Sequence, residues 1–364
     1  MENRAVENGV CSTESVNVSC DVWSCKNSDS SSADHLVIMV HGILGSNTDW
    51  KFGAEQFVRT LPDKVFVHCS EKNMFRLTLD GVDVMGDRLA EEVLEVIQRK
   101  PNLQKISFVA HSVGGLVARY AIGRLYRPPK KENVEDSTNG TSIDDLKATI
   151  GGLEPMNFIT VATPHLGSRG NKQVPFLFGV PAFEKAANLL IHWIFKRTGR
   201  HLFLNDDDEG QPPLLKRMIE DYDIVGWRTS SIRRTIELPK WEDYINKEYP
   251  HIVYEEHCKA CDTEQSELIS TDDDSFDKLE EELVTGLSRL SWEKVDASFH
   301  TCRQRFAAHS VIQVKDQSMH IEGADAVQHM IDHFLLQWLL RHNTLQLDAR
   351  SNMIRVVHDS RILD

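Results

Sequence analysis

Four short apolar runs alternate along the first half of the chain with segments whose apolar residues recur at helical spacing. The first run, "HLVIMV" from His35, has the length and β-branching of a buried strand. The later runs cover 64–69, 105–110 and 156–162, and the helical patterns cover 86–100 and 113–126. Strands that are apolar throughout, alternating with amphipathic helices, predict an α/β fold with a mostly parallel sheet and helices on both faces.

Polar segments divide the rest of the chain. Residues 1–34 are rich in Ser, Asn and Asp and predict a disordered N-terminal tail. One domain is expected over 35–345, with a polar surface loop at 127–145, an acidic insertion at about 255–282 and a C-terminal tail at 346–364.

Charge and composition narrow the function classes. The chain has 364 residues, a net charge of −14 and 41% hydrophobic residues, which is ordinary for a globular protein but not for one that binds nucleic acid. No apolar run reaches the roughly 18 residues of a membrane span, and the N-terminus lacks a signal-peptide core. These features predict a soluble intracellular protein, in the cytoplasm or in an organelle.

Seven cysteines are scattered along the chain, an odd number without the spacing of a disulfide framework. Cys258 and Cys261, with His251 and His257 nearby, are compatible with zinc. A second matching pair is absent, so reduced thiols are the favoured interpretation. No metal and no cofactor are expected.

The stretch "KISFVAHSVGGLVARY" places Ser112 between a strand and a helix, with the small residues Ala110 and Gly114 on either side. This is the pattern of a nucleophile elbow, although Gly is more usual than Ala at the first position. The N–H of Val113 would then face a developing oxyanion. The alternative is a serine that only caps the helix.

A second motif strengthens the elbow. "HGILG", from His41 to Gly45, directly follows the strand 35–40. Its glycines allow a close approach to the elbow, and the N–H of Ile43 can supply the second oxyanion donor. Together the two motifs favour a serine hydrolase. His41 and His111 are expected to hold loops rather than to act as the base.

The motifs "VIMVHGILGSNTDW", "ISFVAHSVGGLVARYAIG", "FITVATPHLGS", "VGWRTSSIRR" and "MIDHFLL" resemble the plant branch of the putative serine esterases, which are lipase-like α/β-hydrolases. The resemblance covers most of the chain after residue 34. It implies the α/β-hydrolase fold and hydrolysis of acyl esters, of lipids above all.

A serine hydrolase also needs an acid, which lies between the serine and the base in the chain order of this fold. The resemblance implies Asp223 in "EDYDIVGW", and Asp221 is its nearest rival; 206–208 is a charge run expected to be solvated. Family members carry an extra helix and strand after "PLLKRM", where this chain has only "IEDY". We therefore expect the acid-bearing strand to be missing, leaving a groove or an exposed edge beside the strand 156–162.

Two histidines compete for the role of base. His320 precedes the final predicted helix and is favoured if "SVIQVK" at 310–315 is the last strand. The resemblance favours His309, through an H-x-x-I pattern at the base position of related lipases. His309 is the preferred base and His320 the alternative. His329 and His333 lie on the final helix and are expected to be structural.

The segment 171–204 predicts a lid. Its helical part starts at Pro181, carries Phe183, Leu190 and Ile194, and ends in basic residues. Such a helix can present apolar and basic residues of 181–201 to a lipid surface, or it can be a buried cap. The favoured function is a serine esterase or lipase that forms an acyl-enzyme on Ser112. The alternatives are a non-lipid carboxylesterase or thioesterase, and a truncated protein that binds lipid or a partner without turnover.

Overall fold

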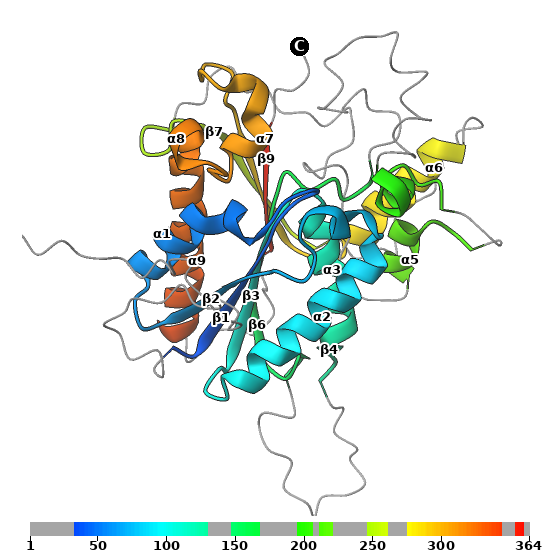
Figure 1. Cartoon of the computed structure of the whole chain (residues 1–364), viewed down its shortest axis with the longest axis horizontal. Coiled ribbons are helices and arrows are strands. Elements are labelled where there is room, and N and C mark those ends of the chain that lie inside the picture. The colour runs from blue at the N-terminus through cyan, green and yellow to red at the C-terminus, as the bar shows by residue number, and fades with distance from the viewer. Residues whose placement is uncertain are drawn as a thin grey trace, which may run out of the picture.

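A seven-stranded sheet forms the centre of the molecule (Figure 1). The computed structural model describes residues 33–129, 147–167, 195–206, 211–220, 246–260, 275–343 and 354–359. The strand order is β2-β1-β3-β6-β9-β8-β7, and only β7 runs antiparallel to its neighbour. The strands are β1 (His35–Val40), β2 (Val65–Cys69), β3 (Lys105–His111), β6 (Glu154–Val161), β7 (Ile252–Cys258), β8 (Trp292–Ala297) and β9 (Ile354–Asp359); β4 (Tyr126–Arg127) and β5 (Thr149–Ile150) pair separately.

Helices cover both faces of this sheet. The α-helices are α1 (Lys51–Thr60), α2 (Val82–Arg99), α3 (Val113–Leu125), α5 (Leu214–Glu220), α6 (Ser275–Leu287), α7 (Ala308–Val311), α8 (Gln317–His320) and α9 (Ala324–Asn343). Short 3-10 turns are η1 (Asn47–Trp50), η2 (Phe75–Leu79), η7 (Arg305–Ala307) and η8 (Ile321–Gly323). Figure 1 shows α1 and α9 on one side of the sheet and α2, α3, α5 and α6 on the other.

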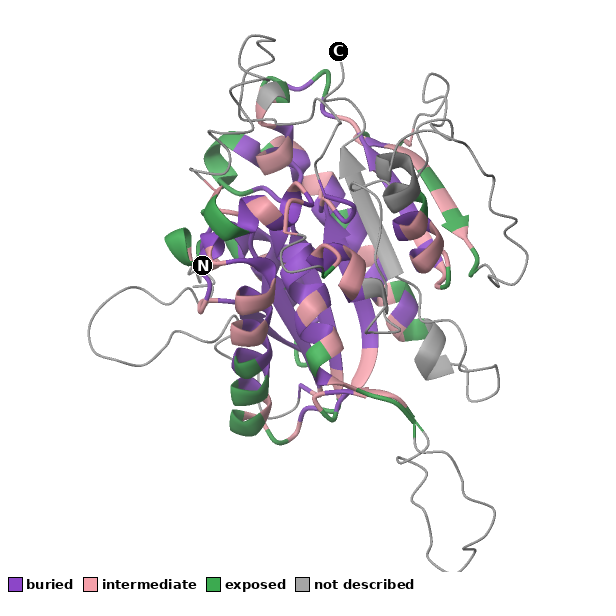
Figure 2. Cartoon of the chain, turned by 90° about the vertical axis from the view of Figure 1, so that its right-hand side faces the viewer, coloured by how far each residue is buried: buried purple, intermediate pink, exposed green. Residues whose placement is uncertain are grey.

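The alternation of side chains along each strand builds two cores. Leu36 and Ile38 of β1 pack in a cluster with α2 and α3, whereas Val37 and Met39 belong to a cluster with α1 and α9. Because successive side chains of a strand point to opposite faces, a strand that is covered on both faces is apolar throughout. Figure 2 shows the resulting buried centre. The predicted α/β architecture is confirmed, and the run 35–40 coincides with β1.

The expectation of a groove or an exposed edge beside the strand 156–162 is wrong. Strand β9 lies there, paired in parallel with β6 from Phe158↔Ile354 to Val161↔Val357 and with β8 on its other side. Residues 354–359 were assigned by their sequence to a C-terminal tail. The physical reason is that two strand edges with unpaired backbone groups accept any segment of β propensity that can reach them, and "MIRVV" is such a segment.

The predicted acidic insertion at 255–282 also contributes to the fold. Its first residues complete β7, which pairs with β8 along its length. Residues 275–282 begin α6, and in the next turn Leu283 and Val284 are buried against the core that holds α2 and α3. The insertion is therefore interrupted by regular structure, although its composition is that of a loop.

Candidate active site

Ser112 occupies a sharp turn between β3 and α3. Its backbone has φ 54° and ψ −133°, a strained conformation that a residue with a side chain rarely adopts. The Ser112 N–H donates to the carbonyl of Val161 over 2.8 Å, which ties the turn to β6. The Ser112 side chain makes no capping hydrogen bond to α3, so the alternative of a helix-capping serine is wrong.

Small residues around the turn are a steric requirement. A Cβ on Gly114 would lie 2.4 Å from the carbonyl oxygen of His41 and 2.7 Å from that of Val40. A Cβ on Gly42 would lie 2.9 Å from the Cβ of Ser112. The loop after β1 therefore presses directly against the elbow, as the two glycine-rich motifs predict.

The loop after β1 is arranged to present one N–H. The N–H of Leu44 donates to Thr78 Oγ1 over 2.8 Å, and that of Gly45 donates to the carbonyl of Gly42 over 3.1 Å. Among the described residues, the N–H of Ile43 has no such partner. Val113 supplies the first N–H of α3, where an intrahelical acceptor does not exist. The role of both groups as oxyanion donors stays a prediction that this geometry supports.

His309 lies against the elbow. It belongs to α7, in the connection between β8 and α9, and its ring centroid is 4.4 Å from that of His111. The Nε2–H of His111 donates to the carbonyl of His309 over 2.7 Å. His111 thus holds a loop, and the loop that it holds carries the preferred base.

The electrostatics keep both imidazoles neutral. Burial lowers the pKa of His309 to about 4, with a smaller contribution from the charge of Lys315. Burial, followed by the proximity of His309, lowers the pKa of His111 well below its ordinary value. A neutral imidazole can accept a proton, which is what a general base must do. Lys315 itself is held by Asp49 at 2.9 Å, an ion pair that no local sequence pattern marks.

His320 occupies a different setting. It is buried, and its Nδ1 accepts the backbone N–H of Asp316 over 3.1 Å. The argument that favoured His320 depended on a last strand at 310–315, and that condition is not met because these residues lie in α7 and the turns that follow. The structure therefore shows a contact with the elbow region for His309 and a local turn contact for His320.

The catalytic acid implied by the resemblance falls outside the part of the chain that the structure describes. Asp223 and its rival Asp221 are outside the described residues, as are Asp207 and Asp208. Asp206 was expected to be solvated, but its side chain is only 8% exposed and accepts the N–H of Leu214 over 2.8 Å. Its carboxylate is therefore a structural acceptor at the start of α5.

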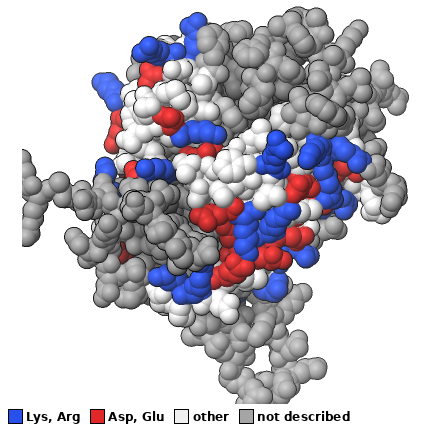
Figure 3. Space-filling model, viewed as in Figure 1, with Lys and Arg blue, Asp and Glu red and all other residues white. Residues whose placement is uncertain are grey.

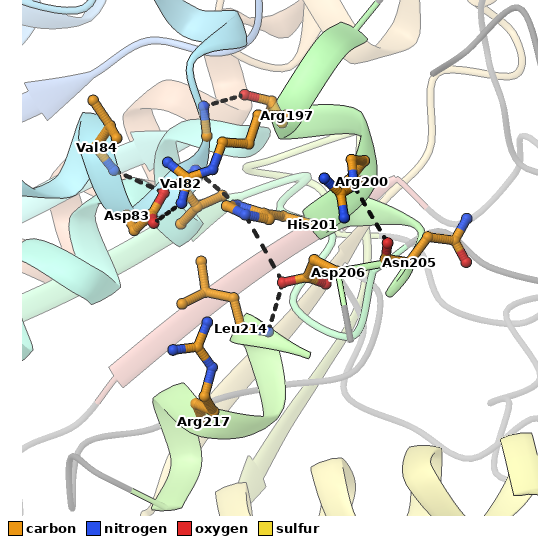
Figure 4. A network of polar contacts seen from close by, with 12 residues as sticks. Val82, Asp83, Val84, Arg197, Arg200, His201, Asn205, Asp206, Leu214 and Arg217 are labelled. Atoms are coloured by element: carbon orange, nitrogen blue, oxygen red, sulfur yellow. Dashed lines mark hydrogen bonds and ion pairs between the residues drawn. The ribbon is translucent and has the colours of Figure 1, made fainter. Parts of the chain in front are cut away.

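Figure 4 shows the C-terminal end of the predicted lid fastened to the start of α2. Thr198 donates its hydroxyl to the carbonyl of Thr78 over 2.8 Å, and His201 Nδ1 accepts the N–H of Val82 over 3.0 Å. Because Thr78 also accepts the N–H of Leu44, one residue joins the lid end to the loop of Ile43. Arg197 forms an ion pair with Asp83. Residues 168–194, which make up most of the predicted lid, lie outside the described residues.

Charged side chains of both signs are interspersed over the face in Figure 3. Around α2, Arg88 pairs with Asp80 over 2.7 Å and Arg124 pairs with Asp87 over 2.9 Å. Within the described part of the chain, no three His, Cys, Asp or Glu side chains form a metal-binding group. No described helix is long and apolar enough to cross a bilayer. Cys261 lies outside the described residues.

Comparison with known proteins gives a consistent result. Residues 30–234, more than half of the chain, match the family described as "Putative serine esterase (DUF676)". The chain is 31% identical over 185 residues to the "Putative lipase ROG1" of Saccharomyces cerevisiae, which covers 50% of this chain and 23% of that protein. It is 29% identical over 192 residues to the "Putative lipase C4A8.10" of Schizosaccharomyces pombe, covering 50% and 21%. The chain thus spans about a quarter of these relatives' length.

Similar solved structures are more distant. They include the Bacillus licheniformis lipase BlEst2, with 18% identity, a TM-score of 0.30 and coverage of 53% of this chain and 65% of that one. The phospholipase PlaB from Legionella pneumophila has 15% identity and a TM-score of 0.31, with coverage of 52% and 34%.

Proposed function

The chain belongs to the family of putative serine esterases, and from that premise we propose that it is a carboxylic ester hydrolase with Ser112 as nucleophile. The observation that carries the proposal is the backbone of Ser112, held at φ 54° after a parallel strand with a hydroxyl that does not cap the helix. Strain of this kind persists where the surrounding structure imposes it, and it places the serine Oγ above the edge of the sheet.

The proposed reaction has two halves. His309 Nε2 takes the proton of the Ser112 hydroxyl while the Oγ attacks the ester carbonyl carbon. The carbonyl oxygen becomes an oxyanion between the N–H groups of Ile43 and Val113. His309 then gives its proton to the leaving alcohol, and an acyl-enzyme remains. In the second half, His309 takes a proton from water as the water oxygen attacks the acyl carbonyl, and it then gives that proton to Ser112 Oγ as the carboxylic acid leaves. Asp223 orients the imidazole in both halves.

The proposed substrates are lipids of the acylglycerol or phospholipid type. Support comes from the predicted lid at 171–204, whose described end is joined through Thr78 to the loop of Ile43. A lid that moves would therefore act on the same loop that offers the oxyanion donor. We also propose that 181–201 makes peripheral contact with a membrane surface, where a lipid substrate would be met. Turnover that rises at a lipid–water interface would distinguish this proposal from a non-lipid carboxylesterase or thioesterase.

A second candidate is a protein that binds lipid without turnover. The observation in its favour is the sheet position beside β6, which β9 occupies from the C-terminal end of the chain. A strand that arrives by this route does not lead into Asp223. Poor orientation of the base would lower activity, and a protein that has lost all activity would retain only lipid binding.

Labelling with a fluorophosphonate tests the proposal, because the reagent reports an activated serine whatever the substrate. The full chain and the Ser107→Ala variant should be labelled, and Ser112→Ala should not. Ser107 is the matched control, since it lies on the same strand and bonds to His35 Nε2 over 2.8 Å. Hydrolysis of a short p-nitrophenyl ester should fall by about 10³-fold or more in Ser112→Ala. Folded full chain that takes no label would favour the non-catalytic candidate.

A further inference from the structure

A second nucleophile, base and carboxylate lie together at the end of β8. The Sγ of Cys302 is 3.0 Å from Nε2 of His251, and Nδ1 of His251 is 2.8 Å from Oδ1 of Asp325. The other carboxylate oxygen, Oδ2, accepts the backbone N–H of His251 over 2.8 Å. Asp325 therefore holds both the ring and the backbone of this histidine.

Separate elements fix this set. His251 directly precedes β7, and its carbonyl accepts the N–H of Ser298, just after β8, over 2.8 Å. Its ring stacks on Phe299, with centroids 4.9 Å apart and an interplanar angle of 26°. Cys302 lies in a turn in which its own N–H donates to the carbonyl of Phe299. Asp325 lies in the first turn of α9. The imidazole is thus oriented by packing as well as by hydrogen bonds.

This arrangement determines which proton can move. Nδ1 of His251 donates its proton to Asp325, which leaves the Nε2 lone pair directed at the sulfur. The imidazole can then take the thiol proton, and the carboxylate stabilises the imidazolium that forms. A thiolate is the nucleophilic form of cysteine, and a neighbouring imidazolium favours it.

We propose that Cys302 is a site of covalent modification by hydroperoxides and by small soft electrophiles. In the reaction with a hydroperoxide, the thiolate sulfur attacks one oxygen, a sulfur–oxygen bond forms and the oxygen–oxygen bond breaks. The sulfur loses two electrons and becomes a sulfenic acid, and the departing oxygen takes the proton from His251 Nε2 and leaves as water or an alcohol. This proposal stands independently of the proposed esterase activity.

The other described thiols provide an internal comparison. Cys302 is 7% exposed and Cys69 is 6% exposed, so access to the two is nearly equal. Cys258 is more exposed, but burial raises the pKa of its thiol, an effect that the charge of Lys294 opposes and that of Glu256 reinforces. Exposure alone predicts that Cys258 reacts first and that Cys302 resembles Cys69. The pairing with His251 predicts instead that Cys302 reacts fastest of the three.

The test measures the rate at each thiol in the full chain. The protein is exposed to limiting hydrogen peroxide with dimedone as a trap, and to iodoacetamide in a separate series, and each cysteine is followed by peptide mass spectrometry. We expect Cys302 to react at least about tenfold faster than Cys69 and Cys258 at neutral pH. His251→Gln should bring Cys302 down to the rate of Cys69 without changing Cys69. Equal rates at Cys302 and Cys69 in the unaltered chain would overturn the proposal, as would an unchanged rate in His251→Gln.

A measurement on the unaltered chain avoids any folding defect of the variant. The alkylation rate of an unassisted thiol rises about tenfold per pH unit below its pKa, because the thiolate fraction does so. A thiol paired with an imidazole should show a much flatter rate between about pH 6 and 8. A slope of about tenfold per pH unit at Cys302 would contradict the proposal, and Asp325→Asn should steepen the slope if the carboxylate supports the pair.

Discussion

The imidazole of His111 donates a hydrogen bond from Nε2 to the backbone carbonyl of His309 over 2.7 Å. One partner directly precedes Ser112, and the other is the proposed base, 198 positions further along the chain. Because the bond reaches the backbone of His309, it positions the loop and leaves the imidazole of His309 available for chemistry. The two halves of the candidate site are joined by this contact.

Removal of this bond should reduce activity more than stability. His111→Leu retains most of the side-chain volume but cannot donate to the carbonyl, so the loop of His309 should shift. We expect kcat/KM for a p-nitrophenyl ester to fall by about tenfold to a hundredfold. The control is His35→Leu, which loses a buried histidine bond to Ser107 on the same sheet. Equal losses of activity in the two variants would argue against a positioning role for His111.

Single alanine variants should separate the two candidate bases. The rate of ester hydrolysis by His309→Ala should fall to that of Ser112→Ala, since triad members act as a unit. The double variant should lose little further activity. His320→Ala should retain most of its turnover, because His320 bonds to the backbone of Asp316 in its own turn. The measurement is steady-state hydrolysis by each variant. A loss of activity in His320→Ala but not in His309→Ala would identify His320 as the base.

The acid limb of the pH profile should lie well below the ordinary pKa of histidine. The neutral imidazole is the active form, and burial lowers the pKa of His309 to about 4, so the base stays unprotonated until that pH is approached. Lys315→Met removes a nearby positive charge and should move the limb to higher pH. Lys72→Met, at an exposed pair with Glu95, is the control. A limb near 6.5 in the unaltered protein would show that His309 is not the titrating base.

Glu92 should contribute to stability in a pH-dependent way. Burial opposes its ionisation, but the hydrogen bond and charge of His68, with bonds from Glu71 N–H and the Ser70 hydroxyl, outweigh burial and lower the pKa of Glu92. A lowered pKa in the folded state means that stability is present above the unfolded pKa and is lost as pH falls through the folded pKa.

Glu92→Gln should therefore destabilise the fold by about 1–3 kcal/mol at neutral pH, measured by urea unfolding. The difference from the unaltered protein should shrink as pH falls below the ordinary carboxyl value of 4.5. Glu95→Gln, on the same helix but at an exposed ion pair, should change stability by less than about 1 kcal/mol. A pH-independent effect of Glu92→Gln would contradict the linkage.

Strand β9 should be essential for the integrity of the sheet. Deletion of 346–364 removes a strand that pairs on both sides, so the edges of β6 and β8 become unpaired. We expect the melting temperature to fall by more than about 5 °C and light scattering to reveal aggregation. Deletion of only 360–364, which follows β9, is the control. Equal melting temperatures of the two truncated forms would show that β9 does not stabilise this sheet.

Local patterns were sufficient for β1, β2, β3 and β6 and for the elbow. A buried strand needs a short apolar run, and an elbow needs small residues within two positions of the serine. The clash that a Cβ on Gly114 would cause with the carbonyl of His41 confirms why glycine stands there. Interactions of this kind extend over a few residues and can be recognised in the chain itself.

Only the tertiary structure decided which segment lies beside β6, because a strand edge is satisfied by backbone pairing that carries little sequence information. The same holds for the contact of His111 with His309 and for the set of Cys302, His251 and Asp325. Each joins residues from separate elements, and no periodicity or spacing within one segment marks such a meeting. The sequence by itself therefore determined the first parallel strands, the helices between them and the sharp turn that carries Ser112, whereas chain packing decided which side chains of distant segments lie next to one another.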